Sequence, residues 1–152
     1  MRYYVIMLLG ITKSIERISS FINSFEDCSL PKPMWTHKAH FIVGLWYSIH
    51  YEQEEALNKI RENIKKYNVS KRVMNTESTG YHETVTVFYL WAINKFLLEN
   101  AYENKLDIRL FQDLLESYVT DKEYPFKYYS KELLSSKKAK EGLVNPDLKE
   151  LD

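Results

Sequence analysis

The chain of 152 residues is poor in cysteine and carries no excess of either charge. Its one cysteine, Cys28, cannot form an internal disulfide, and no motif around it indicates a nucleophile, so we expect a cytoplasmic protein. Lysine and arginine together number 21, as do aspartate and glutamate, which gives a formal net charge of zero. Nucleic-acid-binding domains are usually basic, and we therefore expect no nucleic-acid partner.

The sequence has no hydrophobic run long enough to cross a membrane. The longest stretches without a charged side chain are 39–51 and 84–94, whereas a transmembrane helix needs roughly 20 apolar residues. Arg2 followed by apolar residues 3–9 resembles the start of a secretory signal, but no small-residue cleavage pattern follows. We expect no membrane partner, and we interpret residues 1–11 as part of the fold, either helical or extended.

Glycine and proline are also scarce, at four each, and Pro31 and Pro33 mark a connector because proline ends a helix. Elsewhere apolar residues recur at intervals of three and four, which predicts amphipathic helices. We expect one all-α domain over 1–152, with a bundle of about five main helices at about 14–120 and an irregular, aromatic-rich C-terminal arm over 121–152. The predicted main helices are 14–25, 37–51, 52–67, 80–100 and 107–119.

Aromatic residues, by contrast, make up 14% of the chain, and twelve of them are tyrosines. Tyrosine supplies a large apolar surface together with a hydroxyl that needs a hydrogen-bond partner. This composition is compatible with a core edged by polar groups and with a ligand pocket, and it leaves both a small-molecule partner and a homo-oligomer open.

Three of the four histidines lie in two short motifs at the heads of uncharged segments, Trp35-Thr36-His37-Lys38-Ala39-His40 and Gly80-Tyr81-His82-Glu83-Thr84. Each motif begins a helix that we expect to be buried, so the imidazoles should face the interior, where polar groups need partners. The motifs therefore locate a candidate site.

In the predicted helix 37–51, one face carries His37, His40, Gly44 and Tyr47. Glycine in the middle of a helix costs about 1 kcal/mol relative to alanine, so Gly44 indicates a close approach by a neighbouring helix or a ligand. In the predicted helix 80–100, His82 shares a face with Thr86, Tyr89 and Ile93, and Glu83 lies about a quarter-turn away. We expect these two helices to be in contact at the centre of the bundle.

Several motifs occur together along most of residues 14–148. As a set, they resemble a family of small, largely uncharacterised all-helical bacterial proteins. The resemblance implies that the segments form one unit, and it carries no reaction or cofactor. The motifs are Trp35-Thr36-His37, Ala39-His40, Asn75-Thr76-Glu77, Gly80-Tyr81-His82-Glu83-Thr84, Tyr128-Tyr129-Ser130 and Asn145-Pro146-Asp147-Leu148.

The candidate site has three interpretations. His37 and His40 are three residues apart and could ligate one metal ion with His82 and Glu83, a donor set suited to Zn, Fe, Mn or Ni. In that interpretation the protein is a metal binder or a metal-dependent enzyme, with Glu83 as the candidate catalytic base. However, the sequence contains neither the His-Glu-x-x-His motif of zinc peptidases nor the Glu-x-x-His pair of di-iron bundles.

The second interpretation is a metal-free pocket for a small organic molecule, bordered by Gly44, Tyr47 and Tyr89. The third is a structural or interaction protein in which the histidines form a hydrogen-bonded polar network and no site. The third is the default, because buried polar clusters are commonly architectural. His50 lies at the end of its predicted helix and is most simply explained as a solvent-facing group. The basic residues of 59–72 lie at the end of the next predicted helix, where cations interact favourably with the helix dipole.

Overall fold

The computed structural model describes residues 10–100, 102 and 105–152, so the predictions for 1–9 lie outside the described residues. The described part of the chain consists of helices and contains no strand, which confirms the all-α bundle. The five main helices are α2 (Ile15–Glu26), α3 (His37–His50), α4 (Gln53–Ser70), α5 (Glu83–Glu99) and α6 (Ile108–Glu116). The shorter elements are α7 (Lys131–Leu134), α8 (Lys137–Glu141) and the 3-10 turns Lys32–Met34, Tyr118–Thr120 and Tyr124–Lys127.

The helices start where the sequence supplies N-cap side chains. Ser14 Oγ accepts a hydrogen bond from Arg17 N ahead of α2, and Thr36 Oγ1 accepts one from Ala39 N ahead of α3. Asp107 accepts from the amide of Arg109 at the start of α6. These bonds pair amide groups that have no partner within a helix, which fixes the start of each helix.

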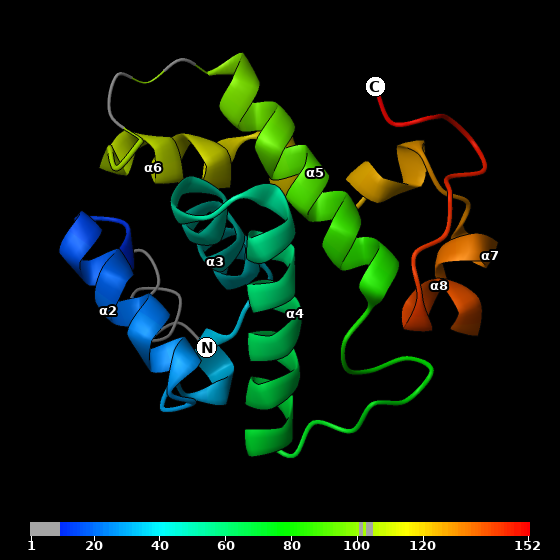
Figure 1. The fold of residues 1–152 in the computed structure, drawn as a ribbon, viewed down its shortest axis with the longest axis horizontal. Coiled ribbons are helices and arrows are strands. Elements are labelled where there is room, and N and C mark those ends of the chain that lie inside the picture. The colour runs from blue at the N-terminus through cyan, green and yellow to red at the C-terminus, as the bar shows by residue number, and fades with distance from the viewer. Residues whose placement is uncertain (1–9, 101, 103–104) are drawn as a thin grey trace.

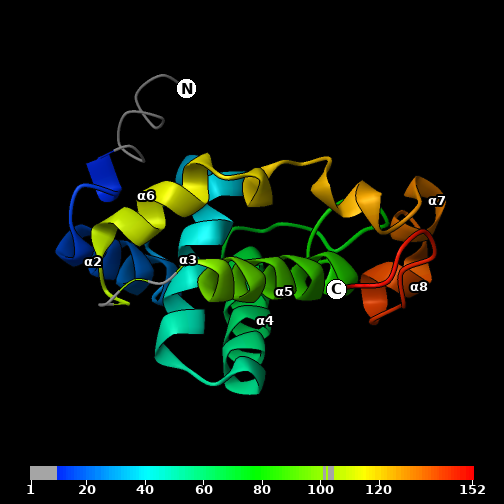
Figure 2. The same ribbon diagram turned by 90° about the horizontal axis from the view of Figure 1, so that it is seen from above.

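Helix α3 lies at the centre of the bundle, in contact with α4, α5 and α6 (Figures 1 and 2). Its contact with α5 confirms that the two motif-bearing helices are neighbours. At this contact the Ile93 side chain packs directly on Gly44, where an added Cβ would lie 2.7 Å from Ile93 Cδ1. The neighbouring helix therefore accounts for the mid-helix glycine.

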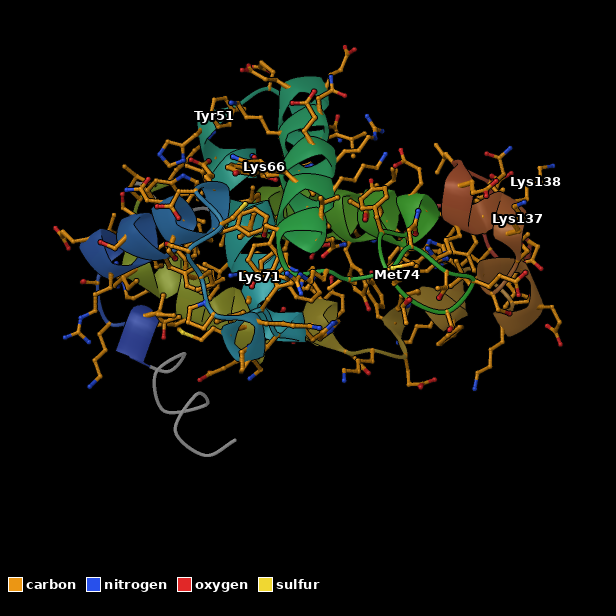
Figure 3. The ribbon with its side chains drawn as sticks, turned by 90° about the horizontal axis from the view of Figure 1, so that it is seen from below. Tyr51, Lys66, Lys71, Met74, Lys137 and Lys138 are labelled. Atoms are coloured by element: carbon orange, nitrogen blue, oxygen red, sulfur yellow. The ribbon has the colours of Figure 1, made fainter. Side chains whose placement is uncertain are left out.

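Helix α4 is longer than predicted, and its basic residues do not form a patch. The helix runs past Tyr67 to Ser70, so its last turn contains no basic residue, contrary to the expectation from the sequence. Lys59, Lys65 and Lys71 lie over tyrosine rings, and Lys66 Nζ donates to a backbone carbonyl of α2. Figure 3 shows Lys66 and Lys71 among the side chains of this face. Each of these four lysines thus has a partner within the protein.

The C-terminal arm packs beside the N-terminal half of α5, on the side of the molecule opposite α2 (Figures 1 and 2). Tyr124, Tyr128 and Tyr129 are buried there, and their rings contact Phe88 of α5. One cluster of buried apolar residues extends from Ile11 to Leu134, so it includes the arm as well as the bundle. In the part of the chain that the structure describes, no helix is both long and apolar enough to span a membrane.

Candidate functional site

A cavity of about 560 Å³ lies between the N-terminal half of α3, the C-terminal half of α4 and the N-terminal half of α5. Its walls are mostly apolar and aromatic, and they include residues of both histidine motifs. His37 and His40 come from the first motif, and Tyr81 and His82 from the second. The structure therefore brings the two motifs together around one space.

His40 borders this cavity with a ring whose tautomer is fixed. Its Nδ1 lies 2.6 Å from Thr36 O, and because a carbonyl can only accept, Nδ1 carries the proton. The ring packs against Trp35 at a centroid distance of 3.9 Å. The His40 side chain keeps accessible surface, while desolvation by the protein around the ring lowers its pKa to about 4. At neutral pH the imidazole is uncharged, and its Nε2 is an acceptor.

His37 is arranged in the same way with the nitrogens exchanged. Its Nε2 donates to Thr120 O at 2.8 Å, which leaves Nδ1 as the acceptor. Desolvation lowers the pKa of His37, and the nearby ammonium of Lys122 lowers it further. Within the described residues, neither His37 Nδ1 nor His40 Nε2 has a protein partner. The cavity therefore contains two neutral imidazoles, each with one unpaired nitrogen.

His82 has a different role from the one that the sequence predicts. Helix α5 begins at Glu83 and not at Gly80, and His82 is its N-cap, with Nδ1 accepting from Val85 N at 3.2 Å. Its Nε2 donates to Leu134 O at the end of α7 at 2.7 Å. Both nitrogens are therefore used, and desolvation lowers the pKa of this imidazole as well. His82 thus lines the cavity, and its hydrogen bond to Leu134 O links the start of α5 to the C-terminal arm.

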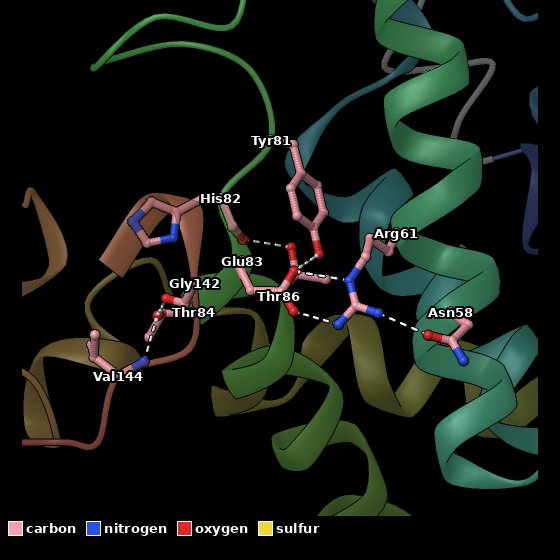
Figure 4. A network of polar contacts seen from close by, with 9 residues as sticks. All are labelled: Asn58, Arg61, Tyr81, His82, Glu83, Thr84, Thr86, Gly142 and Val144. Atoms are coloured by element: carbon pink, nitrogen blue, oxygen red, sulfur yellow. Dashed lines mark hydrogen bonds and ion pairs between the residues drawn. The ribbon is translucent and has the colours of Figure 1, made fainter. Parts of the chain in front are cut away.

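Glu83 points away from His82, as Figure 4 shows. Its carboxylate forms a two-point ion pair with the guanidinium of Arg61 in α4 and also accepts a hydrogen bond from Tyr81 Oη at 2.6 Å. The bonds from Arg61 hold the pKa of Glu83 below its ordinary value. Glu83 does not line the cavity. It is an ionised carboxylate that links α4 to the start of α5, and its role as a catalytic base stays a prediction.

The four predicted metal ligands do not converge. No group of three or more His, Cys, Asp and Glu side chains in the described ranges lies in an arrangement that could hold a metal ion. The physical reason is local: His82 and Glu83 are adjacent residues at the start of α5, and their side chains turn to opposite sides. His37 and His40 line the cavity together with His82 but without Glu83, and both ring nitrogens of His82 are bonded to protein.

Of the predicted pocket residues, Gly44 and Tyr89 line the cavity and Tyr47 does not. Tyr47 is fully buried nearer the C-terminal end of α3, where its hydroxyl donates to Glu26 and accepts from Asn63. Glu26 and Asn63 satisfy the hydrogen-bonding capacity of this hydroxyl within the protein. Tyr47 is therefore absent from the lining, while Gly44 and Tyr89 are part of it.

Sequence reasoning missed several residues that build the site. Lys140 in α8 is buried, and its ammonium donates to Asn75 Oδ1 and to Tyr81 O, which holds the loop before α5 against the arm. Gly80 in this loop has φ +92°, and a Cβ there would meet Asn75 at 2.8 Å. These contacts join residues far apart in the sequence, so no short-range pattern announces them.

The C-terminal motifs support the same wall. Asp147 accepts hydrogen bonds from both the amide and the hydroxyl of Ser130. Ser130 is the N-cap of α7, and the last residue of α7, Leu134, supplies the carbonyl that binds His82. Thr84 Oγ1 likewise donates to Gly142 O. These hydrogen bonds link Asp147 and Ser130 of the C-terminal motifs, through α7, to His82 in the wall of the cavity.

Comparisons with models of protein families, with curated proteins and with solved structures gave no match for this chain.

Proposed function

We propose that the protein is a small-molecule binding module whose ligand occupies the cavity between α3, α4 and α5. The observation that carries this proposal is the pair of unpaired imidazole nitrogens, on His37 and His40, in a cavity with mostly apolar walls. Ligand sites in proteins combine these features, an apolar pocket of about 300–1,000 Å³ with a few polar groups that orient the ligand.

A purely architectural role explains the rest of the polar network but not these two nitrogens. In the described part of the chain, Ser48 Oγ is the one fully buried side-chain polar atom without a partner. Tyr81, His82 and Glu83 have all their main groups bonded to protein. The imidazoles of α3 differ because both residues line the cavity and each ring keeps one nitrogen without a protein partner in the described residues. This difference favours a ligand over an internal network.

Blocking the cavity tests the proposal. Val85 lines the cavity from α5, and Val87 is on the same helix but not in the lining, so Val85→Phe and Val87→Phe add the same ring at two places. We expect wild type and Val87→Phe to bind indole, a planar molecule that fits the volume, and Val85→Phe not to bind it. Titration calorimetry measures this directly, with circular dichroism to verify folding. If Val85→Phe binds indole as wild type does, the cavity is not the site.

The other expectations from the sequence, on location, partners, source and oligomeric state, are part of this proposal. A cytoplasmic location rests on the single cysteine, and the lack of a nucleic-acid partner rests on the zero net charge. The motif resemblance supports a bacterial source. A homo-oligomer remains a hypothesis, which light scattering tests.

A further inference from the structure

The hydroxyl groups that border the cavity have their protons engaged by the protein. Tyr67 donates to Leu30 O at 2.9 Å, and Tyr89 donates to Asp121 O at 3.2 Å. Thr86 donates to His82 O, and Tyr81 donates to Glu83. A hydroxyl whose proton is already bonded can only accept from a ligand.

The two imidazoles add acceptors of the same kind. The bonded nitrogens of His37 and His40 must be the protonated ones, because their partners are carbonyl oxygens. The free nitrogen of each ring then has a lone pair and no proton. The donors left in the lining are the amide of Asn68, the indole N–H of Trp35 and two ammonium groups. The wall next to α3 is therefore rich in acceptors.

The charged side chains in the lining itself are lysines, while Asp121 and Glu123 lie close enough to Tyr89 of the lining to raise its pKa. Lys32 and Lys122 line the cavity and are exposed, and neither forms an ion pair with a carboxylate in the described residues. No aspartate or glutamate occurs in the lining. Two cations in the lining attract an anionic group and disfavour a cationic one.

We propose that the ligand is a planar organic acid with an N–H or O–H donor, with the donor bound by His37 or His40 and the acidic group bound by Lys32 and Lys122. This inference rests on the proposed function, because it needs the cavity to be the binding site. The aromatic walls, which include Trp35, suit the planar part.

Two matched pairs of probes test the two halves of the inference. Indole and benzothiophene have the same shape, and only indole has an N–H donor. We expect calorimetry to show roughly tenfold tighter binding of indole, since one added hydrogen bond contributes about that factor. Indole-3-acetate and tryptamine differ in charge, and we expect the anion to bind tighter than indole and the cation weaker.

Variants then assign the effects to residues. His40→Phe should remove the preference for indole over benzothiophene. His50→Phe is the control, because His50 is on the same helix, has the same type of Nδ1 bond to a carbonyl and lies outside the cavity. Should His40→Phe not fold, His37→Phe takes its place.

For the charges, Lys32→Gln with Lys122→Gln should remove the advantage of indole-3-acetate over tryptamine. The control, Lys137→Gln with Lys138→Gln, makes the same change of net charge on α8, away from the cavity lining (Figure 3).

The outcomes separate the two proposals. Equal binding of indole and benzothiophene to wild type, with both lost in Val85→Phe, overturns the donor half and leaves the proposed function standing. Equal binding of indole-3-acetate and tryptamine overturns the charge half in the same way. Binding of none of the four probes at millimolar concentration overturns the inference and the proposed function together.

Discussion

The two ends of helix α3 carry the same local arrangement in different surroundings. At the N-terminal end, His40 donates from Nδ1 to the carbonyl four residues earlier and packs on Trp35 at 3.9 Å. At the C-terminal end, His50 donates from Nδ1 to the carbonyl of Trp46, also four residues earlier, and stacks on that ring at 4.1 Å. Only His40 borders the cavity.

This comparison shows that the local sequence determines the tautomer of each histidine, whereas segments distant in the sequence determine whether the ring lines a cavity. Both rings have a protonated Nδ1 and an unpaired Nε2 for the same backbone reason. Both side chains have accessible surface, but His40 shares the cavity lining with residues of α4, α5 and the loop before α5, whereas His50 is outside that lining. A candidate function follows from the shared lining and not from the histidine alone.

The largest effect should come from breaking the loop before α5 at Gly80. Its φ of +92° and its contact with Asn75 leave no room for a Cβ, so Gly80→Ala should lower the free energy of unfolding by about 2–3 kcal/mol. Urea denaturation measures this. Gly142→Ala is the control, because Gly142 is extended and its added Cβ would meet no atom closer than 3.9 Å. Equal stability of the two variants would mean that the loop is not held as described.

Removing the imidazole of His82 should have the next largest effect. His82→Ala loses the N-cap of α5 and the bond to Leu134 O, and we expect a loss of about 1–2 kcal/mol. Thermal and urea unfolding report it, with Glu77→Ala in the exposed part of the loop as a control that stays near wild type. An unchanged unfolding midpoint for His82→Ala would show that the imidazole does not stabilise the contact between α5 and the arm.

The pH dependence of stability should distinguish the two ends of α3. An imidazole has an ordinary pKa of 6.5, and burial lowers that of folded His40 to about 4. Protonation thus favours the unfolded state. The contribution of His40 is complete above about pH 6.5 and is lost as the pH falls toward 4. His37 and His82 act in the same direction.

The difference between wild type and His40→Phe isolates the contribution of His40, measured as urea midpoints at several pH values. His40→Phe should lose less stability than wild type does between pH 6.5 and 4. Parallel curves for the two proteins would show that the protein around this ring does not desolvate it.

The smallest effect is expected at the other end of the helix. His50→Phe replaces an exposed ring, so the free energy of unfolding should change by no more than about 0.5 kcal/mol. A larger loss would show that the His50 contact with Trp46 stabilises α3 and that the two ends are less different than their surroundings indicate.

The sequence predicts the main helices well because each depends on local features. The spacing of apolar residues and the caps Ser14, Thr36 and Asp107 all act within one or two turns. The same reasoning grouped the two histidine motifs, and residues of both line the cavity.

The contacts within the site depend on partners far along the chain, and they were not predicted. Histidine is an unusual N-cap, so the start of α5 was placed at Gly80 and His82 was assigned to a helical face. Glu83 pairs with Arg61, 22 residues earlier, and Lys140 is 65 residues from Asn75. No periodic pattern records such pairs, because they form only when the helices pack.

The most direct test of the account observes both ends of α3 in one sample. In nitrogen-15 spectra of the imidazole rings of untagged protein, His40 and His50 should both show a protonated Nδ1 and an unprotonated Nε2. On addition of indole, the Nε2 resonance of His40 should shift in the direction of an accepted hydrogen bond, and that of His50 should remain in place. Equal shifts at both rings, or an unchanged His40 with indole bound, would contradict the account.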